Sequence, residues 1–149
     1  MKNMNKLSLR IATIEDKSLL FEWRNITELV QLSYLKKNVT IEEHDIWFNE
    51  KLSNPDSEIV IVELNNLPIG LIRMDFKIES CAISIYLIPG NHGKGYGFKA
   101  LSLVLNNYNN LSDKYSAKVQ TGNIPSQKLF LKLGFIESYR DDEFIKYIK

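Results

Sequence analysis

The stretch that decides the fold reads Ile85-Tyr86-Leu87-Ile88-Pro89-Gly90-Asn91-His92-Gly93-Lys94-Gly95-Tyr96-Gly97-Phe98-Lys99-Ala100-Leu101. An apolar strand, ended by Pro89, runs through four glycines directly into a helix. Glycines let the backbone adopt conformations closed to other residues and bring its amides close to a ligand. The N-terminus of the following helix adds unpaired amides and a positive dipole end. The stretch therefore predicts an anion site, most naturally for a pyrophosphate, with Lys94 adding charge.

This glycine loop does not fit the two best-known phosphate motifs. It lacks the terminal Gly-Lys-Ser/Thr of a P-loop. It is not a convincing dinucleotide fingerprint, and a chain of 149 residues is short for a full Rossmann domain.

Strands and helices are expected on both sides of the loop. Alternating and helical hydrophobic patterns predict strands at 7–11, 59–64, 67–76, 82–88, 115–121, 135–137 and 144–148, and helices at about 13–25, 40–52, 98–109 and 125–133. Thr13 and Thr40 each stand three residues before an acid, which is a helix-capping signature. Asn65-Asn66 predicts a tight turn, and Gly134 a helix end. The expected fold class is α+β, with a mixed, mostly antiparallel sheet flanked by helices.

Length and composition narrow the class of protein. A chain of 149 residues fits one domain over 1–149. The 19 Lys and Arg nearly balance the 18 Asp and Glu, which argues against a nucleic-acid partner. The single cysteine, Cys81, excludes an internal disulfide framework. No apolar run approaches the roughly 20 residues of a membrane helix, and no signal peptide is recognisable, so a cytoplasmic protein without a membrane partner is expected.

Two motifs carry a resemblance to a known family. His92-Gly93-Lys94-Gly95-Tyr96-Gly97 aligns with the motif Gln/Arg-x-x-Gly-x-Gly/Ala, and the segment 123–135 aligns with Asn-x-x-Ser/Ala followed by Leu-Tyr-x-Lys-x-Gly-Phe. Both motifs occur in order and about 30 residues apart. The chain thereby resembles the GNAT superfamily (Gcn5-related N-acetyltransferases). The resemblance implies a GNAT-like fold, acetyl-coenzyme A as co-substrate and an amine as acceptor. No metal is expected, because no cluster of His, Cys and carboxylates has metal-ligand spacing.

The resemblance also implies a role for each matching position. Backbone groups of Leu87 and Ile88 would hold the pantetheine arm like an added strand, and an amide there would polarise the thioester carbonyl. Asn123 would contact the arm, and Phe130 would pack near the thioester. The implied cofactor-binding residues are Leu87, Ile88, His92, Gly93, Lys94, Gly95, Tyr96, Gly97, Asn123 and Phe130.

Three positions depart from the family pattern. His92 replaces the usual Gln or Arg. Phe130 stands where many relatives carry the tyrosine that protonates the departing thiolate, and Ala82 stands where a glutamate base is often found. The acid is therefore expected from Tyr139, Tyr96 or solvent, with Tyr139 as the catalytic candidate. The two missing groups also leave open a non-catalytic acyl-CoA sensor.

The N-terminal third is expected to shape the acceptor site. Its pattern Trp-Arg-Asn, at 23–25, followed by Glu-Glu-His-x-x-Trp-Phe, at 42–48, resembles a GNAT subgroup acting on nucleotide-linked amino sugars. It is most similar to the acetyltransferases of pseudaminic acid biosynthesis, which acetylate the 4-amine of a UDP-linked sugar. Ribosomal-protein N-terminal acetyltransferases share part of the pattern, so a peptide or small-amine acceptor is the alternative.

Specific residues follow from this interpretation. His44 is the candidate base, because a neutral imidazole can accept a proton near pH 7; simple packing is its alternative role. The expected substrate-binding residues are Trp23, Arg24, Tyr34, Trp47 and Phe48, and for the aromatic residues burial in the core is the alternative. Arg24 or Arg73 would meet a phosphate. Exposed edges and apolar faces are compatible with a homodimer.

Overall fold

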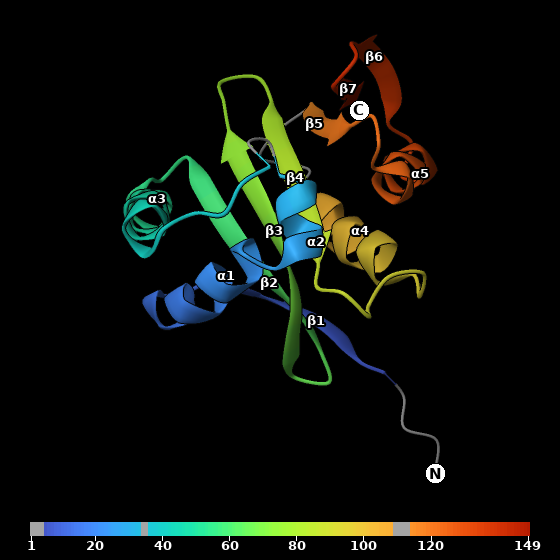
Figure 1. Ribbon diagram of the computed structural model, residues 1–149. Helices are drawn as coiled ribbons and strands as arrows, with labels where there is room; N and C mark the ends of the chain where they lie inside the picture. Colours follow the sequence, from blue (N-terminus) through green and yellow to red (C-terminus); the bar gives the residue numbers. More distant parts are fainter. Residues whose placement is uncertain (1–4, 34–35, 109–113) are drawn as a thin grey trace.

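The computed structural model describes residues 5–33, 36–108 and 114–149, and its elements follow the predicted order (Figure 1). The strands are β1 (Leu7–Ile11), β2 (Ser57–Leu64), β3 (Leu67–Phe76), β4 (Cys81–Leu87), β5 (Tyr115–Gln120), β6 (Ile136–Arg140) and β7 (Phe144–Ile148). The helices are the short 3-10 helix η1 (Ile14–Asp16), α1 (Lys17–Arg24), α2 (Thr27–Gln31), α3 (Ile41–Ser53), α4 (Tyr96–Tyr108) and α5 (Ile124–Lys132). Helix α2 was not predicted, because five residues are too few to show a helical period.

The strands form one seven-stranded sheet in the order β1-β2-β3-β4-β5-β7-β6. Every neighbouring pair is antiparallel except β4 and β5, which run parallel. The predicted α+β class with a mostly antiparallel sheet is therefore confirmed. The turn between β2 and β3 is also as predicted, with Asn65 and Asn66 at φ values of 52° and 67°.

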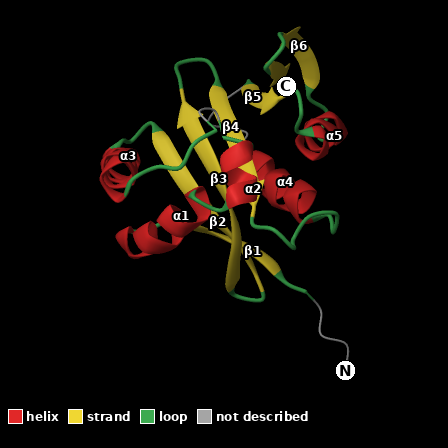
Figure 2. Ribbon diagram, in the orientation of Figure 1, coloured by secondary structure: helices red, strands yellow, loops and turns green. Residues whose placement is uncertain are grey.

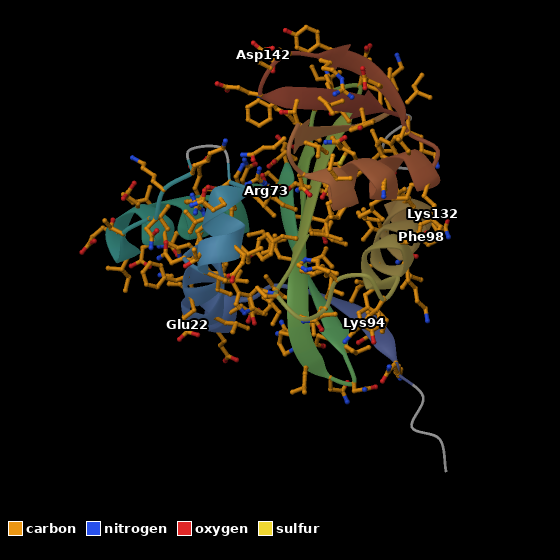
Figure 3. All side chains as sticks on the ribbon, turned by 45° about the vertical axis from the view of Figure 1, so that its right-hand side comes forward. Glu22, Arg73, Lys94, Phe98, Lys132 and Asp142 are labelled. Atoms are coloured by element: carbon orange, nitrogen blue, oxygen red, sulfur yellow. The ribbon has the colours of Figure 1, made fainter. Side chains whose placement is uncertain are left out.

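Helices cover both faces of the sheet (Figures 2 and 3). Alternate residues of β2 point to opposite sides: Ile59 and Ile61 pack with α1 to α3, whereas Val60 and Val62 pack on the side of α4. This alternation follows from the two-residue period of a strand. The acceptor motifs of the N-terminal third and the glycine loop consequently belong to different layers.

Local signals fix the helix starts. The Thr40 hydroxyl accepts a hydrogen bond from the Glu43 amide at 3.1 Å, and the Glu43 carboxylate accepts one from the Thr40 amide at 3.1 Å. Thr13 and Asp16 form the same reciprocal cap at η1. Such a cap stabilises a helix by about 1 kcal/mol. In the described part of the chain, no helix is both long enough and apolar enough to cross a membrane.

Candidate functional site

The sheet opens between β4 and β5. Their parallel pairing consists of only two residue pairs, Cys81 with Tyr115 and Ala82 with Ser116. Strand β4 stays paired with β3 as far as Leu87. Beyond Ala82 the two parallel strands therefore diverge, and Figure 1 shows β5 to β7 turned away from β1 to β4.

A cleft of about 710 Å³ lies where the two strands diverge. Its volume lies in the range of small-molecule binding sites. Strands β3 to β7 and the loops next to them line one part of the cleft. Helix α5 and the segment after α2 line the rest. The lining residues are Leu32, Arg73, Asp75, Lys77, Ala82, Ile83, Ser84, Ile85, Ser116, Ala117, Lys118, Val119, Gln120, Asn123, Ser126, Phe130, Tyr139, Asp141, Phe144 and Lys146.

The backbone of β4 faces the cleft at alternate residues. The Ile88 amide donates to the Ile69 carbonyl at 2.8 Å, on the β3 side. In an antiparallel ladder the neighbouring residue points its amide and carbonyl the other way, so Leu87 and Ile85 direct theirs toward the opening. The Ile88 carbonyl is used as well, since it accepts from the Asn91 side chain at 3.1 Å. Both backbone groups of Ile88 are thus hydrogen-bonded within the chain, whereas Leu87 and Ile85, a residue that the sequence reasoning missed, turn theirs toward the opening.

The glycine loop forms a second, smaller hollow of about 170 Å³ next to the cleft. Gly93 and Gly95 adopt φ values of 74° and 82°, a left-handed conformation that glycine adopts readily and most other residues avoid. Among the expected cofactor residues, those lining this hollow are Leu87, His92, Gly93, Gly95, Tyr96 and Gly97. Ile85 and Ser126 line both hollows, which places the loop at one end of a continuous groove. Lys94 is exposed at the loop (Figure 3).

Helix α5 contributes the opposite wall. The Asn123 side-chain oxygen accepts from the Ser126 amide at 3.3 Å and caps the helix, while the residue also lines the cleft. Phe130 is buried, stacks on Tyr147 and meets Phe135 edge-on. Its ring therefore forms an apolar floor between the two strands. Gly97 lets α4 approach α5, because a Cβ there would lie 3.3 Å from the Leu129 side chain.

A carboxylate reaches the apex of the cleft from β3. Asp75 is paired directly with Ala82, so both side chains lie on the same face. Asp75 accepts from Lys51 at 2.9 Å and from Ser57 at 2.8 Å. Burial opposes ionisation of Asp75, but these hydrogen bonds and the nearby arginine outweigh it, and its pKa lies below the ordinary value. Asp75 is therefore charged and already paired, which makes it a poor proton acceptor.

Arg73 lies beside Asp75 at the edge of the cleft (Figure 3). Its Nε is 3.2 Å from an Asp75 oxygen, close enough for an ion pair, but the N–H is not aimed at the carboxylate, so no hydrogen bond forms. The guanidinium also lies over the Trp47 ring at 5.9 Å. Among the described residues, none accepts a hydrogen bond from its terminal nitrogens.

The other acceptor candidates from the N-terminal third lie away from the cleft. Trp23 and Phe48 are buried in the core under α1 and α3. Arg24 donates to the Lys37 carbonyl at 3.2 Å, and burial lowers its pKa. The Trp47 ring contacts Arg73, which lines the cleft. Tyr34 lies outside the described residues. The motif is thus explained largely by packing and by loop anchoring.

His44 is also buried away from the cleft. Its exposed fraction is 3%, and its ring stacks on Phe48 at 5.8 Å and contacts Phe21 and Trp47. Within the described part of the chain, neither ring nitrogen has a hydrogen-bond partner. Burial lowers the pKa of His44, so the neutral form is favoured. These contacts favour the packing role over that of the base.

The strands after the opening supply residues that sequence reasoning largely missed. Tyr139, a predicted candidate, is 59% exposed and lines the cleft. Lys118 and Lys146 line it as well. The Gln120 side chain donates to the Ser33 carbonyl at 2.7 Å, which ties β5 to the segment after α2. Within residues 5–33, 36–108 and 114–149, no group of His, Cys, Asp and Glu has the arrangement of a metal site.

Comparisons with known proteins agree with this geometry. Residues 6–136 match the family model described as an acetyltransferase (GNAT) domain. A domain from Methanocaldococcus jannaschii is 29% identical, with a TM-score of 0.87 over 98% of this chain and 99% of the other. A search of curated proteins finds no match.

Two enzymes of known structure share the fold at lower identity. Spermidine N-acetyltransferase from Vibrio cholerae, in complex with CoA and spermine, is 16% identical, with a TM-score of 0.81 over 96% of this chain and 94% of the other. The Campylobacter jejuni N-acetyltransferase PseH, in complex with acetyl coenzyme A, is 19% identical, with a TM-score of 0.72 over 97% and 98%.

Proposed function

The chain belongs to the GNAT family of N-acetyltransferases, and on that premise we propose that it transfers an acetyl group from acetyl-coenzyme A to a small-molecule amine. The observation that supports this best is that β4 and β5 pair through two residue pairs and then diverge, next to a glycine loop that leads into helix α4. It provides an extended edge for the pantetheine arm and an amide-lined hollow for the pyrophosphate at the two ends of one groove.

The cofactor would bind through three sets of groups. Amides of the loop, from Gly93 to Gly97, and the start of α4 would hold the pyrophosphate, with His92, Lys94 and Tyr96 around it. Leu87 and Ile85 would pair with the pantetheine amides as a strand does. The Asn123 side-chain NH₂, which the helix cap leaves unused, would donate to the arm, and Phe130 would contact the acetylated end.

The transfer then needs few protein groups. The acceptor nitrogen attacks the thioester carbonyl, whose oxygen is stabilised by a β4 amide, and the carbon–sulfur bond breaks to release coenzyme A as a thiolate. Tyr139 is the hydroxyl that we assign to protonate this thiolate, and water returns a proton to the resulting phenolate. Among the described residues that line the cleft there is no histidine, and its two carboxylates have lowered pKa values. The ammonium proton of the acceptor therefore passes to water.

For the acceptor, we favour the 4-amino group of a UDP-linked amino-deoxy sugar. The shared fold with PseH supports this assignment. Arg73, with terminal nitrogens turned toward no described acceptor, provides a phosphate ligand at the cleft. A polyamine or a peptide N-terminus is the competing acceptor, since the Vibrio cholerae enzyme of the same fold was solved with spermine.

Thiol release from acetyl-CoA, measured against a panel of acceptors, tests the proposal. The panel contains a UDP-linked 4-amino sugar, free amino sugars, spermidine and short peptides with a free N-terminus. Release confined to the nucleotide sugar is the expected result. Release with peptides alone would move the chain to the N-terminal acetyltransferases. Binding of acetyl-CoA without release for any amine would indicate a sensor and contradict the proposal.

A further inference from the structure

Helix α5 ends next to the first turn of helix α4. Gly97 allows this approach, because a Cβ there would lie only 3.3 Å from the Leu129 side chain. At the end of α5, the Lys132 ammonium lies 4.4 Å from the centre of the Phe98 ring, and Figure 3 shows these two side chains together. A cation at this distance is attracted to the face of the ring. The contact therefore orients Lys132, although its side chain is exposed.

Phe98 connects this lysine to the glycine loop. The residue lines the hollow of about 170 Å³ that the loop forms. It stands in the first turn of α4, which begins at Tyr96, and helical side chains tilt toward the N-terminus of their helix. Lys132 thus lies beside the hollow that would hold the pyrophosphate, with Phe98 as the contact between them.

The surroundings of Lys132 favour an anion. None of the described residues that line the hollow is acidic. In the part of the chain that the structure describes, no carboxylate forms an ion pair with Lys132. The nearest acid along the chain, Glu137, is paired with Arg140 at 2.7 Å. The Phe98 ring orients the ammonium but brings no negative charge, so a ligand can supply one.

Coenzyme A carries a third phosphate that fits this position. It is attached to the 3′-oxygen of the ribose whose 5′-oxygen bears the diphosphate, so one sugar ring separates the two groups. As a phosphomonoester it carries about 1.5 to 2 negative charges near neutral pH. Lysine binds such a group as a point charge.

From this arrangement we propose that Lys132, oriented by Phe98, binds the 3′-phosphate of coenzyme A and so distinguishes this cofactor from 3′-dephospho-coenzyme A. The inference rests on the proposed function, because it extends the pyrophosphate site assigned there. It assigns a specific role to a residue that lines neither the cleft nor the hollow.

The test measures how well the full chain discriminates between the two cofactors. Isothermal titration gives the Kd of coenzyme A and of 3′-dephospho-coenzyme A for the wild type, Lys132→Met, Lys132→Arg and Lys128→Met. Methionine keeps an unbranched side chain but removes the charge, whereas arginine retains the charge. Lys128 is the matched control, an exposed lysine one turn earlier on α5 that lines neither hollow. Thermal unfolding checks that each variant is folded.

We expect the wild type to bind coenzyme A about fivefold more tightly than its dephospho form, which is the upper range for an exposed charge pair. This ratio should shrink as salt is raised, because salt screens exposed charges. In Lys132→Met the ratio should approach unity through weaker binding of coenzyme A alone. Lys132→Arg and Lys128→Met should keep the ratio of the wild type.

Three results would overturn the inference: equal binding of the two cofactors by the wild type, an unchanged ratio in Lys132→Met, or an equal fall of the ratio in Lys128→Met. Failure of the proposed function looks different. Binding of neither cofactor would overturn the pyrophosphate site and this inference with it. Absence of thiol release with any amine, while coenzyme A still binds, would overturn acetyl transfer and leave the ratio to decide the role of Lys132.

Discussion

The conformation of Gly95 allows a quantitative prediction about the glycine loop. Its φ of 82° is left-handed, and a Cβ at this position would meet no atom within 4 Å. A Gly95→Ala substitution therefore adds no clash, only the backbone cost of a left-handed L-residue, which is about 1–2 kcal/mol. If the loop keeps its shape, this cost lowers the free energy of unfolding. If the loop relaxes, the amides lose their arrangement and the cost appears as a rise of about 5- to 30-fold in the Kd of coenzyme A.

Calorimetric titration measures the Kd of coenzyme A, and urea unfolding of the unliganded chain measures the free energy of unfolding. Gly90→Ala is the matched control for strain, because Gly90 has a φ of 94°, equally open space, and no place in the lining of either hollow. Gly122→Ala controls for loss of a glycine that is not left-handed. Unchanged affinity and unchanged stability in Gly95→Ala would refute the conformational reasoning. Equal weakening by Gly90→Ala would refute the location of the pyrophosphate site.

Three further predictions concern stability and catalysis. Burial lowers the pKa of His44, so the unfolded state binds a proton at a higher pH than the folded state does. The free energy of unfolding should therefore fall as the pH drops below about 6.5 and stay level above it. Urea unfolding across this pH range should show the slope, and a slope that persists in His44→Phe would contradict its assignment to His44. Gly70→Ala should lower the free energy of unfolding by about 1–3 kcal/mol, because the new Cβ would lie 2.5 Å from the Tyr86 carbonyl oxygen; an unaltered urea midpoint would disprove this. Tyr139→Phe should lower kcat by about 100-fold with little change in the Kd of coenzyme A, and a change below about threefold would assign thiolate protonation to solvent.

The elements of the fold were largely predictable because their signals are local. The caps at Thr13 and Thr40, the Asn65-Asn66 turn and the left-handed Gly134 each depend on a few adjacent residues. The sequence also predicted the glycine loop between a strand and a helix, and its Gly93 and Gly95 adopt the left-handed conformation that favours glycine. Within the described residues, helix α2 was missed, because burial of Leu29 and Val30 stabilises it rather than a long hydrophobic pattern.

The acceptor side of the site was harder to predict, because its residues meet only in the folded chain. Arg24 and Trp23 were predicted to bind the substrate. In the structure Arg24 donates to a loop carbonyl, and Trp23 packs in the core. Lys118 and Lys146 gave no signal, since their pairing depends on a register between strands far apart in the sequence. Alternation along β5 and β7 would have shown which face each lysine occupies, but not that this face borders the opening.

The two-pair contact between β4 and β5 has a consequence for solubility. Past Ala82, each strand presents a row of backbone donors and acceptors that the other does not complete. Unpaired strand edges are templates on which another polypeptide can assemble, and they promote aggregation. Because the pantetheine arm would occupy this edge as a strand, acetyl-coenzyme A would protect the folded enzyme from misassociation as well as serving as the acyl donor. The unliganded protein should accordingly be the more aggregation-prone form.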